Sequence, residues 1–357
     1  MGEEKAEKII LWFEELTRED VPLVGSKCAN LGEMMRIGIP VPSGFAVSAY
    51  AYKRFLEETG VGYKINIVLK KIIKGGGLEE YREVSKRIRR LIEDTPIPRD
   101  IEEGIREAYR ELCRRAGREE YVAVRSSATA EDLLDASFAG QHETYLNVIG
   151  EDEVIKKVQK CWSSLFTPRA IFYREQRGLA HEEVLMSVAV QKMVNARTAG
   201  VMFTIHPVTG EEDKILIEGS WGLGEAVVSG AVTPDEWVVD KKTLEIIERR
   251  IAEKVIEYIR NSKTGRTVHA EVPLGRRKTP CLTDEEVKKL AKLGIRIEKH
   301  YRRPQDIEWA IDRDLPFPNN VFIVQSRAET VWSVRKGQNK KGKDMRMIRA
   351  MRHRPDF

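Results

Sequence analysis

The sequence is poor in cysteine and lacks the spaced ligand motifs of zinc proteins. Its 357 residues include four cysteines, which lie far apart and form no Cys-x-x-Cys pair. This pattern argues against a disulfide framework and against a structural zinc site. No His-Glu-x-x-His motif occurs, and His206, which precedes Pro207, is typical of a structural histidine. We therefore expect four scattered, reduced thiols.

Long apolar segments are missing as well. No run approaches the roughly 18 apolar residues that a membrane-spanning helix needs. The first ten residues, MGEEKAEKII, are acidic and contain no apolar core of a signal peptide. The sequence thus predicts a cytoplasmic protein with no membrane partner.

Positive charge is confined to the end of the chain. The formal net charge is +5, yet residues 333–357 alone hold nine Lys or Arg and two Asp, a net of +7. Residues 1–332 hold 52 basic and 54 acidic residues, a net of −2. A run of Lys and Arg is usually a solvated tail rather than a specific site. We expect a basic, disordered tail over 333–357 and no nucleic-acid partner.

Hydrophobic periodicity predicts helices in the first half of the chain and strands in the second. Thr167-Pro168 and Thr283-x-x-Glu286 are typical helix starts, and we also interpret Asp100 as a helix cap. The expected helices cover 27–37, 81–93, 100–112, 154–165, 168–177 and 284–300. The expected strands cover 9–13, 121–125, 184–194, 200–204, 215–218, 237–239, 306–311 and 321–327. The fold class is therefore α+β, with a mostly antiparallel sheet.

Two strands near the end of the expected fold carry paired polar side chains. Asp306 and Glu308 are two residues apart, so a strand places both on one face and Ile307, Trp309 and Ile311 on the other. Gln325 and Arg327 share a face in the same way, and an antiparallel pairing of the two strands is plausible. Carboxylates can hold Mg²⁺ and an Arg fork can hold phosphates. From these residues alone, a cross-strand salt bridge on a solvated face is the favoured alternative.

Three glycine- or hydroxyl-rich segments are candidate ligand contacts. Gly219–Val227 is neither a dinucleotide fingerprint nor a Walker A loop, but it would bring backbone and Glu225 close to a ligand. Lys27 stands at a predicted helix start, where amides and a cation suit phosphate. Arg125 and the hydroxyls after it end a strand. A tight turn, a capped helix with a surface Lys, and a polar loop are the respective structural alternatives.

Taken in order, six separated blocks resemble the ATP-binding domain of phosphoenolpyruvate synthases (pyruvate, water dikinases). Pyruvate phosphate dikinase has a related domain. The blocks include VGSKCANLGEM, VAVRSSATAED, VAVQKMVNARTAG, IEGSWGLGEAVVSG and PQDIEWAID with VFIVQSRAETVW. The resemblance covers about residues 9–332. It implies an ATP-grasp-like fold, in which a lobe of residues 1–190 and a lobe of residues 191–332 clamp ATP.

The resemblance also implies residue roles. Lys27, Arg125 and Arg327 would contact the ATP phosphates and serve as the catalytic residues. Gln191, Met193 and Val194 would line the adenine, Thr204 would lie by the phosphates and Glu225 near the ribose. Asp306, Glu308 and Gln325 would bind Mg²⁺. These roles favour the functional interpretation of the two polar strands over the salt bridge.

The sequence departs from the family in two ways. The usual Gly-Gly-Lys-Gly is Gly25-Ser26-Lys27-Cys28, and no histidine has the context of the family's phosphorylated carrier. In the family scheme, ATP pyrophosphorylates that histidine, water takes one phosphate and pyruvate takes the other. We expect a phosphotransferase part that binds Mg-ATP and acts on a separate phosphohistidine and pyruvate-domain protein. The alternatives are a truncated, non-catalytic nucleotide-binding fragment and the ATP subunit of a dikinase with another acceptor.

Overall fold

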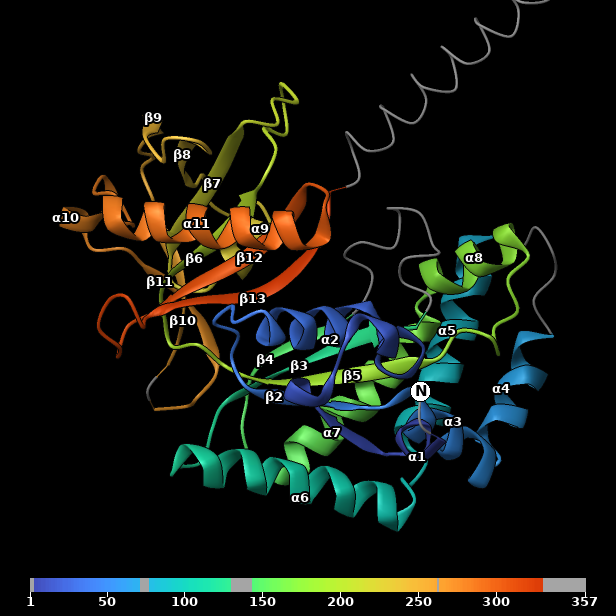
Figure 1. Cartoon of the computed structure of the whole chain (residues 1–357). Coiled ribbons are helices and arrows are strands. Elements are labelled where there is room, and N and C mark those ends of the chain that lie inside the picture. The colour runs from blue at the N-terminus through green and yellow to red at the C-terminus, as the bar shows by residue number, and fades with distance from the viewer. Residues whose placement is uncertain (1–2, 71–76, 130–142, 262, 330–357) are drawn as a thin grey trace, which may run out of the picture.

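The computed structural model describes residues 3–70, 77–129, 143–261 and 263–329. It contains two larger β-sheets, each with helices packed on it (Figure 1). Every strand pairing between named strands of the described chain is antiparallel, which confirms the predicted α+β class. The predicted disordered tail, 333–357, lies outside the described residues. None of the described helices is long and apolar enough to span a membrane.

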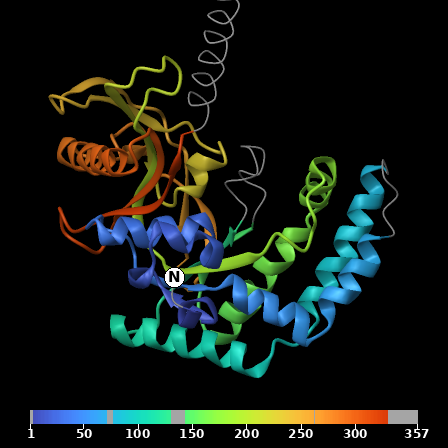
Figure 2. The same ribbon diagram turned by 45° about the vertical axis from the view of Figure 1, so that its right-hand side comes forward.

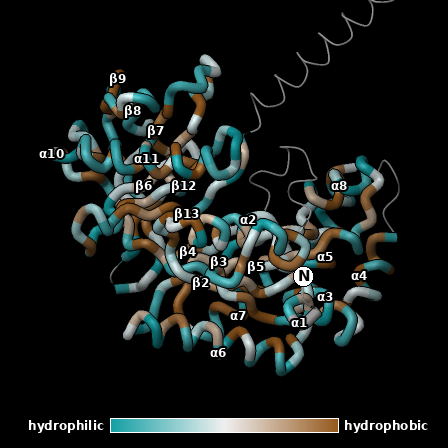
Figure 3. Tube along the Cα trace, viewed as in Figure 1, coloured by the Kyte–Doolittle hydropathy of each residue, from teal (hydrophilic) through white to brown (hydrophobic). Residues whose placement is uncertain are grey.

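The first sheet has five strands in the order β1-β2-β5-β3-β4. These strands are β1 (Ile10–Trp12), β2 (Gly44–Val47), β3 (Val122–Ala128), β4 (Thr144–Val148) and β5 (Met186–Lys192). Alternation along the strands gives the sheet two apolar faces, because Val188 and Val190 belong to one core and Ala189 to another. In Figure 3, many residues around α7 (Glu151–Ser163), which packs on the first face, have the brown colour of hydrophobic residues.

Helices of the first half pack on that face of the first sheet or on the helices that cover it. They are α3 (Ala49–Glu58), α4 (Val61–Leu69), α5 (Leu78–Glu93), α6 (Arg99–Ala116), α7 and α8 (Pro168–Arg177), after a short α1 (Glu3–Ala6). The helix from Thr167 is confirmed, since the Thr167 side chain accepts from Ala170 N and Gly178 ends the helix in the left-handed conformation. The predicted Asp100 cap is wrong: α6 begins at Arg99, and the Asp100 carboxylate instead accepts from Arg54 at 2.6 Å.

The second sheet has six strands in the order β13-β12-β6-β7-β8-β9. Its strands are β6 (Ala196–Phe203), β7 (Lys214–Trp221), β8 (Asp235–Asp240), β9 (Ile246–Arg250), β12 (Gln305–Asp312) and β13 (Val321–Ala328). A separate pair, β10 (Ile256–Arg260) and β11 (Thr267–Glu271), and the short helices α9 (Glu225–Val228) and α10 (Leu274–Arg277) complete this half. The chain passes from the first sheet to the second between β5 and β6.

Helix α11 (Asp284–Tyr301) packs on one face of the second sheet (Figure 1). Its predicted capping box is present: Thr283 Oγ1 accepts from Glu286 N at 3.3 Å, and Glu286 Oε2 accepts from Thr283 N at 3.0 Å. The predicted inward set Ile307, Trp309 and Ile311 is buried in this core. The opposite face of β12 and β13 is therefore left for the polar residues.

Helix α2 (Val21–Arg36) lies between the two sheets, and the turned view of Figure 2 shows the same relation. Its buried residues share one core with Ala189 of the first sheet and with Met202 of the second. The helix is interrupted at Gly25, where φ is 69° and ψ is 165°. A Cβ at Gly25 would lie 2.4 Å from the carbonyl oxygen of Ser127, so only glycine fits this approach. The helix resumes where the sequence predicted its start.

The polar interior of the second half contains a fully buried ion pair. Lys254 Nζ lies 2.5 Å from Asp235 Oδ1, and neither side chain is exposed. Asp235 also accepts from the backbone amides of Ala252 and Cys281, each at 2.9 Å. The carboxylate therefore joins the end of the second sheet to the segment that leads into α11.

Replacing Lys254 by methionine should lower the free energy of unfolding by about 3–5 kcal/mol, because the substitution leaves a buried carboxylate without its counter-charge. The matched control is Lys278→Met, which removes an exposed partner of Glu253 at 3.5 Å and should change stability by about 0.5 kcal/mol or less. Guanidinium denaturation measures both. Equal effects of the two substitutions would contradict the assigned role of the buried pair.

Candidate functional site

Arg125 reaches from the first sheet to the second. From β3, its Nη2 donates to Glu308 Oε2 at 2.8 Å and to Gln325 Oε1 at 2.6 Å, and its Nη1 donates to the carbonyl oxygen of Val324 at 3.2 Å. The side chain is 11% exposed, and its buried Nε has no hydrogen-bond partner. A guanidinium with one unused buried donor is a group that a ligand oxygen would satisfy.

The two polar strands pair as predicted. Asp306 lies opposite Arg327 and Glu308 opposite Gln325, which confirms that the four side chains share one face of the β12–β13 ladder. Arg327 binds Asp306, with Nε at 2.8 Å and Nη2 at 2.6 Å from Oδ2. The salt bridge proposed as the alternative therefore exists, next to the contact of Glu308 with Arg125.

Negative charge accumulates on this face. Burial raises the pKa of Asp306 above its usual value, against the lowering effect of Arg327, and Glu308 and Glu329 raise it further. Across β6, the strand register places Glu218 of β7 in the row of Glu308, with Glu236 of β8 next to it. Burial, Glu236 and Asp306 together raise the pKa of Glu218. The face thus has excess negative charge that a bound cation would relieve.

Lys27 lies beside the same strand as Arg125. Its Nζ donates to the carbonyl oxygen of Ser126, and the helix start is fixed by Ser127, whose Oγ donates to Val24 O at 2.7 Å and accepts from Cys28 N at 3.3 Å. The side chain of Cys28 is fully buried. The cysteine that departs from the family motif therefore points into the core. We call Lys27, Arg125, Asp306, Glu308, Gln325 and Arg327 the Arg125 cluster.

An apolar cluster lies beside these polar residues. It contains Val194, Ala196, Ala199, Leu223 and Ala310, with Leu146, Met193, Tyr258, Phe322 and Val324 packed against it. Val324 precedes Gln325, so the apolar and polar clusters meet on β13. Gln191, at the end of β5, is 2% exposed, and its Nε2 has no hydrogen-bond partner. Sequence reasoning found Met193 and Val194 but missed Leu223 and Phe322. Leu223 stands between two glycines and Phe322 between Val321 and Ile323, so no polar neighbour marks the face on which either lies.

No hydrogen bond or ion pair of Thr204 or Glu225 with the Arg125 cluster is seen in the described residues. Thr204 is fully buried, packs beside Gly294 of α11 as Met202 does, and its Oγ1 accepts from Gln305 N at 2.8 Å. It therefore faces away from Asp306 and Glu308. Glu225 is exposed at the first residue of α9, after the glycine-rich turn.

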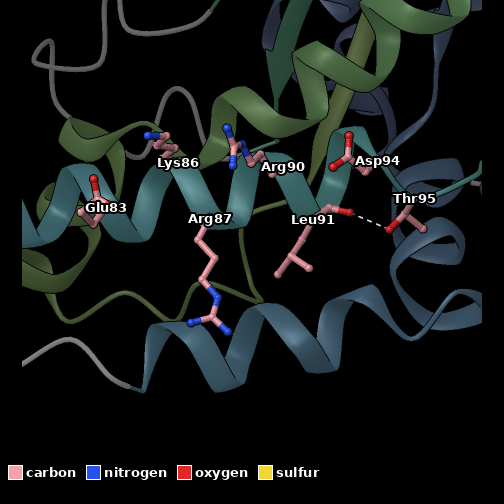
Figure 4. A pocket seen from close by; sticks show the side chains of 7 residues that line it. All are labelled: Glu83, Lys86, Arg87, Arg90, Leu91, Asp94 and Thr95. Carbon is pink, nitrogen blue, oxygen red and sulfur yellow. Dashed lines mark hydrogen bonds between the residues drawn. The ribbon is translucent and has the colours of Figure 1, made fainter.

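A groove of about 370 Å³ lies elsewhere, along α5 (Figure 4). Its lining residues are Glu83, Lys86, Arg87, Arg90, Leu91, Asp94 and Thr95, and the dashed line marks the bond from Thr95 Oγ1 to Leu91 O at 2.6 Å. None of the candidate residues named above lines it. The Arg125 cluster therefore lies outside this groove.

Residues 21–347 match the family model described as "Pyruvate phosphate dikinase, AMP/ATP-binding domain". The chain belongs to this family. All residues of the Arg125 cluster lie within the match. The match runs to residue 347, past Trp332, where the resemblance was expected to end.

Curated relatives of this family member include phosphoenolpyruvate synthases. A probable phosphoenolpyruvate synthase of Staphylothermus marinus is 54% identical over 358 residues, covering 94% of this chain and 43% of that protein. The phosphoenolpyruvate synthase of Aeropyrum pernix is 49% identical, covering 92% and 43%. A probable synthase of Archaeoglobus fulgidus is 52% identical, covering 90% and 41%. The chain thus corresponds to the ATP-binding part and spans about two fifths of these relatives.

The donor set of the Arg125 cluster suits a hard cation. Asp306, Glu308 and Gln325 supply carboxylate and amide oxygens, the ligands that Mg²⁺ prefers, and nucleotide phosphates usually complete its shell. No group of three or more His, Cys, Asp or Glu in the described part of the chain is placed to hold a metal ion alone. The residues therefore fit a magnesium ion that arrives with phosphate, and do not form an all-protein metal cage.

Proposed function

We propose that this chain binds Mg-ATP between its two sheets and passes a pyrophosphoryl group toward a histidine carrier. The observation that carries the proposal is the reach of Arg125 from the first sheet to Glu308 and Gln325 of the second. We propose with it an ATP-grasp-like arrangement, with lobes of residues 1–190 and 191–332. The family match and the relatives support the nucleotide, and the residue roles below are our assignments.

The adenine would lie against the apolar cluster beside the Arg125 cluster. Met193 and Val194, which connect the two sheets, belong to that apolar cluster, and an apolar, sheet-flanked surface with a few polar groups suits a base. The free Nε2 of Gln191 is a buried donor with no protein partner, so a nucleotide acceptor atom would satisfy it. We retain Glu225 as the proposed ribose contact, from α9, and we do not assign Thr204 to the phosphates because its side chain is fully buried against α11.

The phosphates would lie among Lys27, Arg125 and Arg327. Lys27 binds the carbonyl oxygen of Ser126, the residue after Arg125 on β3, and Arg327 binds Asp306 on β12. Together the three cations would neutralise a triphosphate and hold its oxygens by charge-assisted hydrogen bonds. When bound at Asp306, Glu308 and Gln325, Mg²⁺ would supply further neutralisation of phosphate charge. Glu308 Oε2 and Gln325 Oε1 now accept hydrogen bonds from Arg125 Nη2. The Arg125 guanidinium therefore holds one oxygen of each of these two proposed ligands, and we expect it to turn toward the phosphates as Mg-ATP binds.

The acceptor would lie in the part of the relatives that this chain does not span. A phosphohistidine and pyruvate-binding part, supplied by a longer chain or by a separate protein, would take the pyrophosphoryl group and release AMP. Positioning and charge neutralisation are the main tasks of a protein in phosphoryl transfer, and the Arg125 cluster can perform both.

Glu308→Gln should weaken Mg-ATP binding at least about tenfold, because it removes the charge of one proposed ligand, and bonds to charged groups contribute about 1.5–3 kcal/mol. The matched control is Glu236→Gln, which makes the same change on the same sheet face at β8 and should alter the affinity less than about twofold. Isothermal titration calorimetry measures both variants with Mg-ATP and with adenosine. Adenosine affinity should not change. Wild-type affinity for Mg-ATP in Glu308→Gln would contradict the assigned site.

AMP should form when the chain is mixed with Mg-ATP and a protein that supplies the histidine and pyruvate-binding part of a relative. Omitting either protein, or replacing Arg327 by alanine, should reduce AMP formation by at least about a hundredfold. A single arginine that stabilises the transition state of phosphoryl transfer raises kcat by about 10³ or more. Arg82→Ala, an exposed arginine of α5, is the control. ATP binding without AMP formation would instead support a non-catalytic nucleotide-binding fragment, and AMP formation only with a different acceptor would support another dikinase.

A further inference from the structure

Asn30 joins the helix that carries Lys27 to the strand that carries Gln325 and Arg327. It lies one turn after Lys27 on α2, and its Nδ2 donates to the carbonyl oxygen of Ser326 at 3.3 Å. Ser326 is the residue between Gln325 and Arg327 on β13. We propose that Asn30 is a positioning residue that fixes Lys27 relative to Gln325 and Arg327, and this inference rests on the proposed function of the Arg125 cluster.

Tyr301 fixes the orientation of the Asn30 amide. A backbone carbonyl can only accept, so the amide must turn its Nδ2 to Ser326 and its Oδ1 away. Tyr301, the last residue of α11, donates its hydroxyl to Oδ1 at 3.2 Å. Burial of the ring raises the pKa of Tyr301, with a further contribution from Glu33. The hydroxyl therefore stays protonated and remains a donor.

The strand side of the contact is also fixed. Ser326 is buried, and its Oγ donates to Gln305 Oε1 at 2.9 Å. Gln305 Nε2 in turn donates to the carbonyl oxygens of Arg303 and Pro304, each at 3.1 Å. The carbonyl that receives Asn30 is thus held at the edge where β12 begins, beside Asp306. A chain of satisfied hydrogen bonds of this kind fixes one geometry.

Contacts further along α2 hold its other end to α11. His300 Nε2 lies 2.7 Å from Glu33 Oε1, and Arg296 donates to the carbonyl oxygens of Ile37 and Gly38. These contacts dock α2 but lie one to three turns beyond Lys27. Asn30, in contrast, contacts β13 close to Lys27, between that lysine and the strand that carries Gln325 and Arg327. It should therefore affect the phosphate subsite more than the docking of the helix.

The two hydrogen bonds of Asn30 require a donor and an acceptor on one short side chain. Asn30→Ala loses both bonds, and Asn30→Asp places a carboxylate oxygen against the carbonyl of Ser326. Tyr301→Phe keeps the bond to Ser326 and removes only the partner of Oδ1. We expect Mg-ATP affinity to fall about two- to tenfold in Asn30→Ala, the range of one neutral hydrogen bond, and further in Asn30→Asp. Tyr301→Phe should have a smaller effect.

Calorimetric titration of the full chain with Mg-ATP and with adenosine tests the assignment. The variants should lose affinity for Mg-ATP and keep it for adenosine, and Asn30→Ala should add little once Lys27→Ala is present, since the two residues would act as a unit. His300→Gln is the control: it should lower the melting temperature without this selective loss.

Two results separate this inference from the proposed function. A wild-type chain that binds no Mg-ATP would overturn the proposed function, and the positioning role with it. A wild-type chain that binds, together with Asn30 variants that bind Mg-ATP equally well, would overturn the positioning role alone. Equal losses of ATP and adenosine affinity, or additive losses in the Lys27→Ala background, would also overturn it, because they indicate a merely structural role.

Discussion

The contact of Arg125 with Glu308 and Gln325 is the interaction on which the account of this molecule depends. It joins the two sheets by charge-assisted hydrogen bonds of 2.6 and 2.8 Å and leaves one buried donor of the guanidinium without a partner. This cross-sheet bond holds Glu308 and Gln325 beside Arg125 before any ligand arrives. It uses one oxygen of each of these two proposed magnesium ligands, so we expect Arg125 to release them when Mg-ATP binds.

Helix α2 makes that arrangement possible. Its apolar residues pack into one core with both sheets, so Lys27 is held at the junction and not on an outer surface. The left-handed conformation at Gly25 lets the backbone touch β3 beside Ser127, which brings the helix start next to Arg125. Burial of apolar surface supplies the stability, while the polar contacts decide where the two cations stand.

Local patterns were sufficient for the two strands that matter most. The two-residue spacing of Asp306 and Glu308 placed both on one face, and the pairing with Gln325 and Arg327 followed from the short connection. The expected role of Thr204 rests on the resemblance alone, and the structure places its side chain toward α11, two residues after Met202 on the same side. The β10–β11 pair was not predicted from the sequence. Its Tyr258 forms a backbone bridge with the distant Gly222, and strand propensity is weak beside such tertiary contacts.

The most direct test of the central claim is a crystal structure of the chain with Mn²⁺ and a non-hydrolysable ATP analogue, with the metal located by its anomalous signal. The account predicts manganese bound at Glu308 and Gln325, the phosphates between Lys27 and Arg327, and Arg125 turned from the carboxylate to the phosphates. Nucleotide or metal bound elsewhere, with Arg125 still on Glu308 and Gln325, would contradict it.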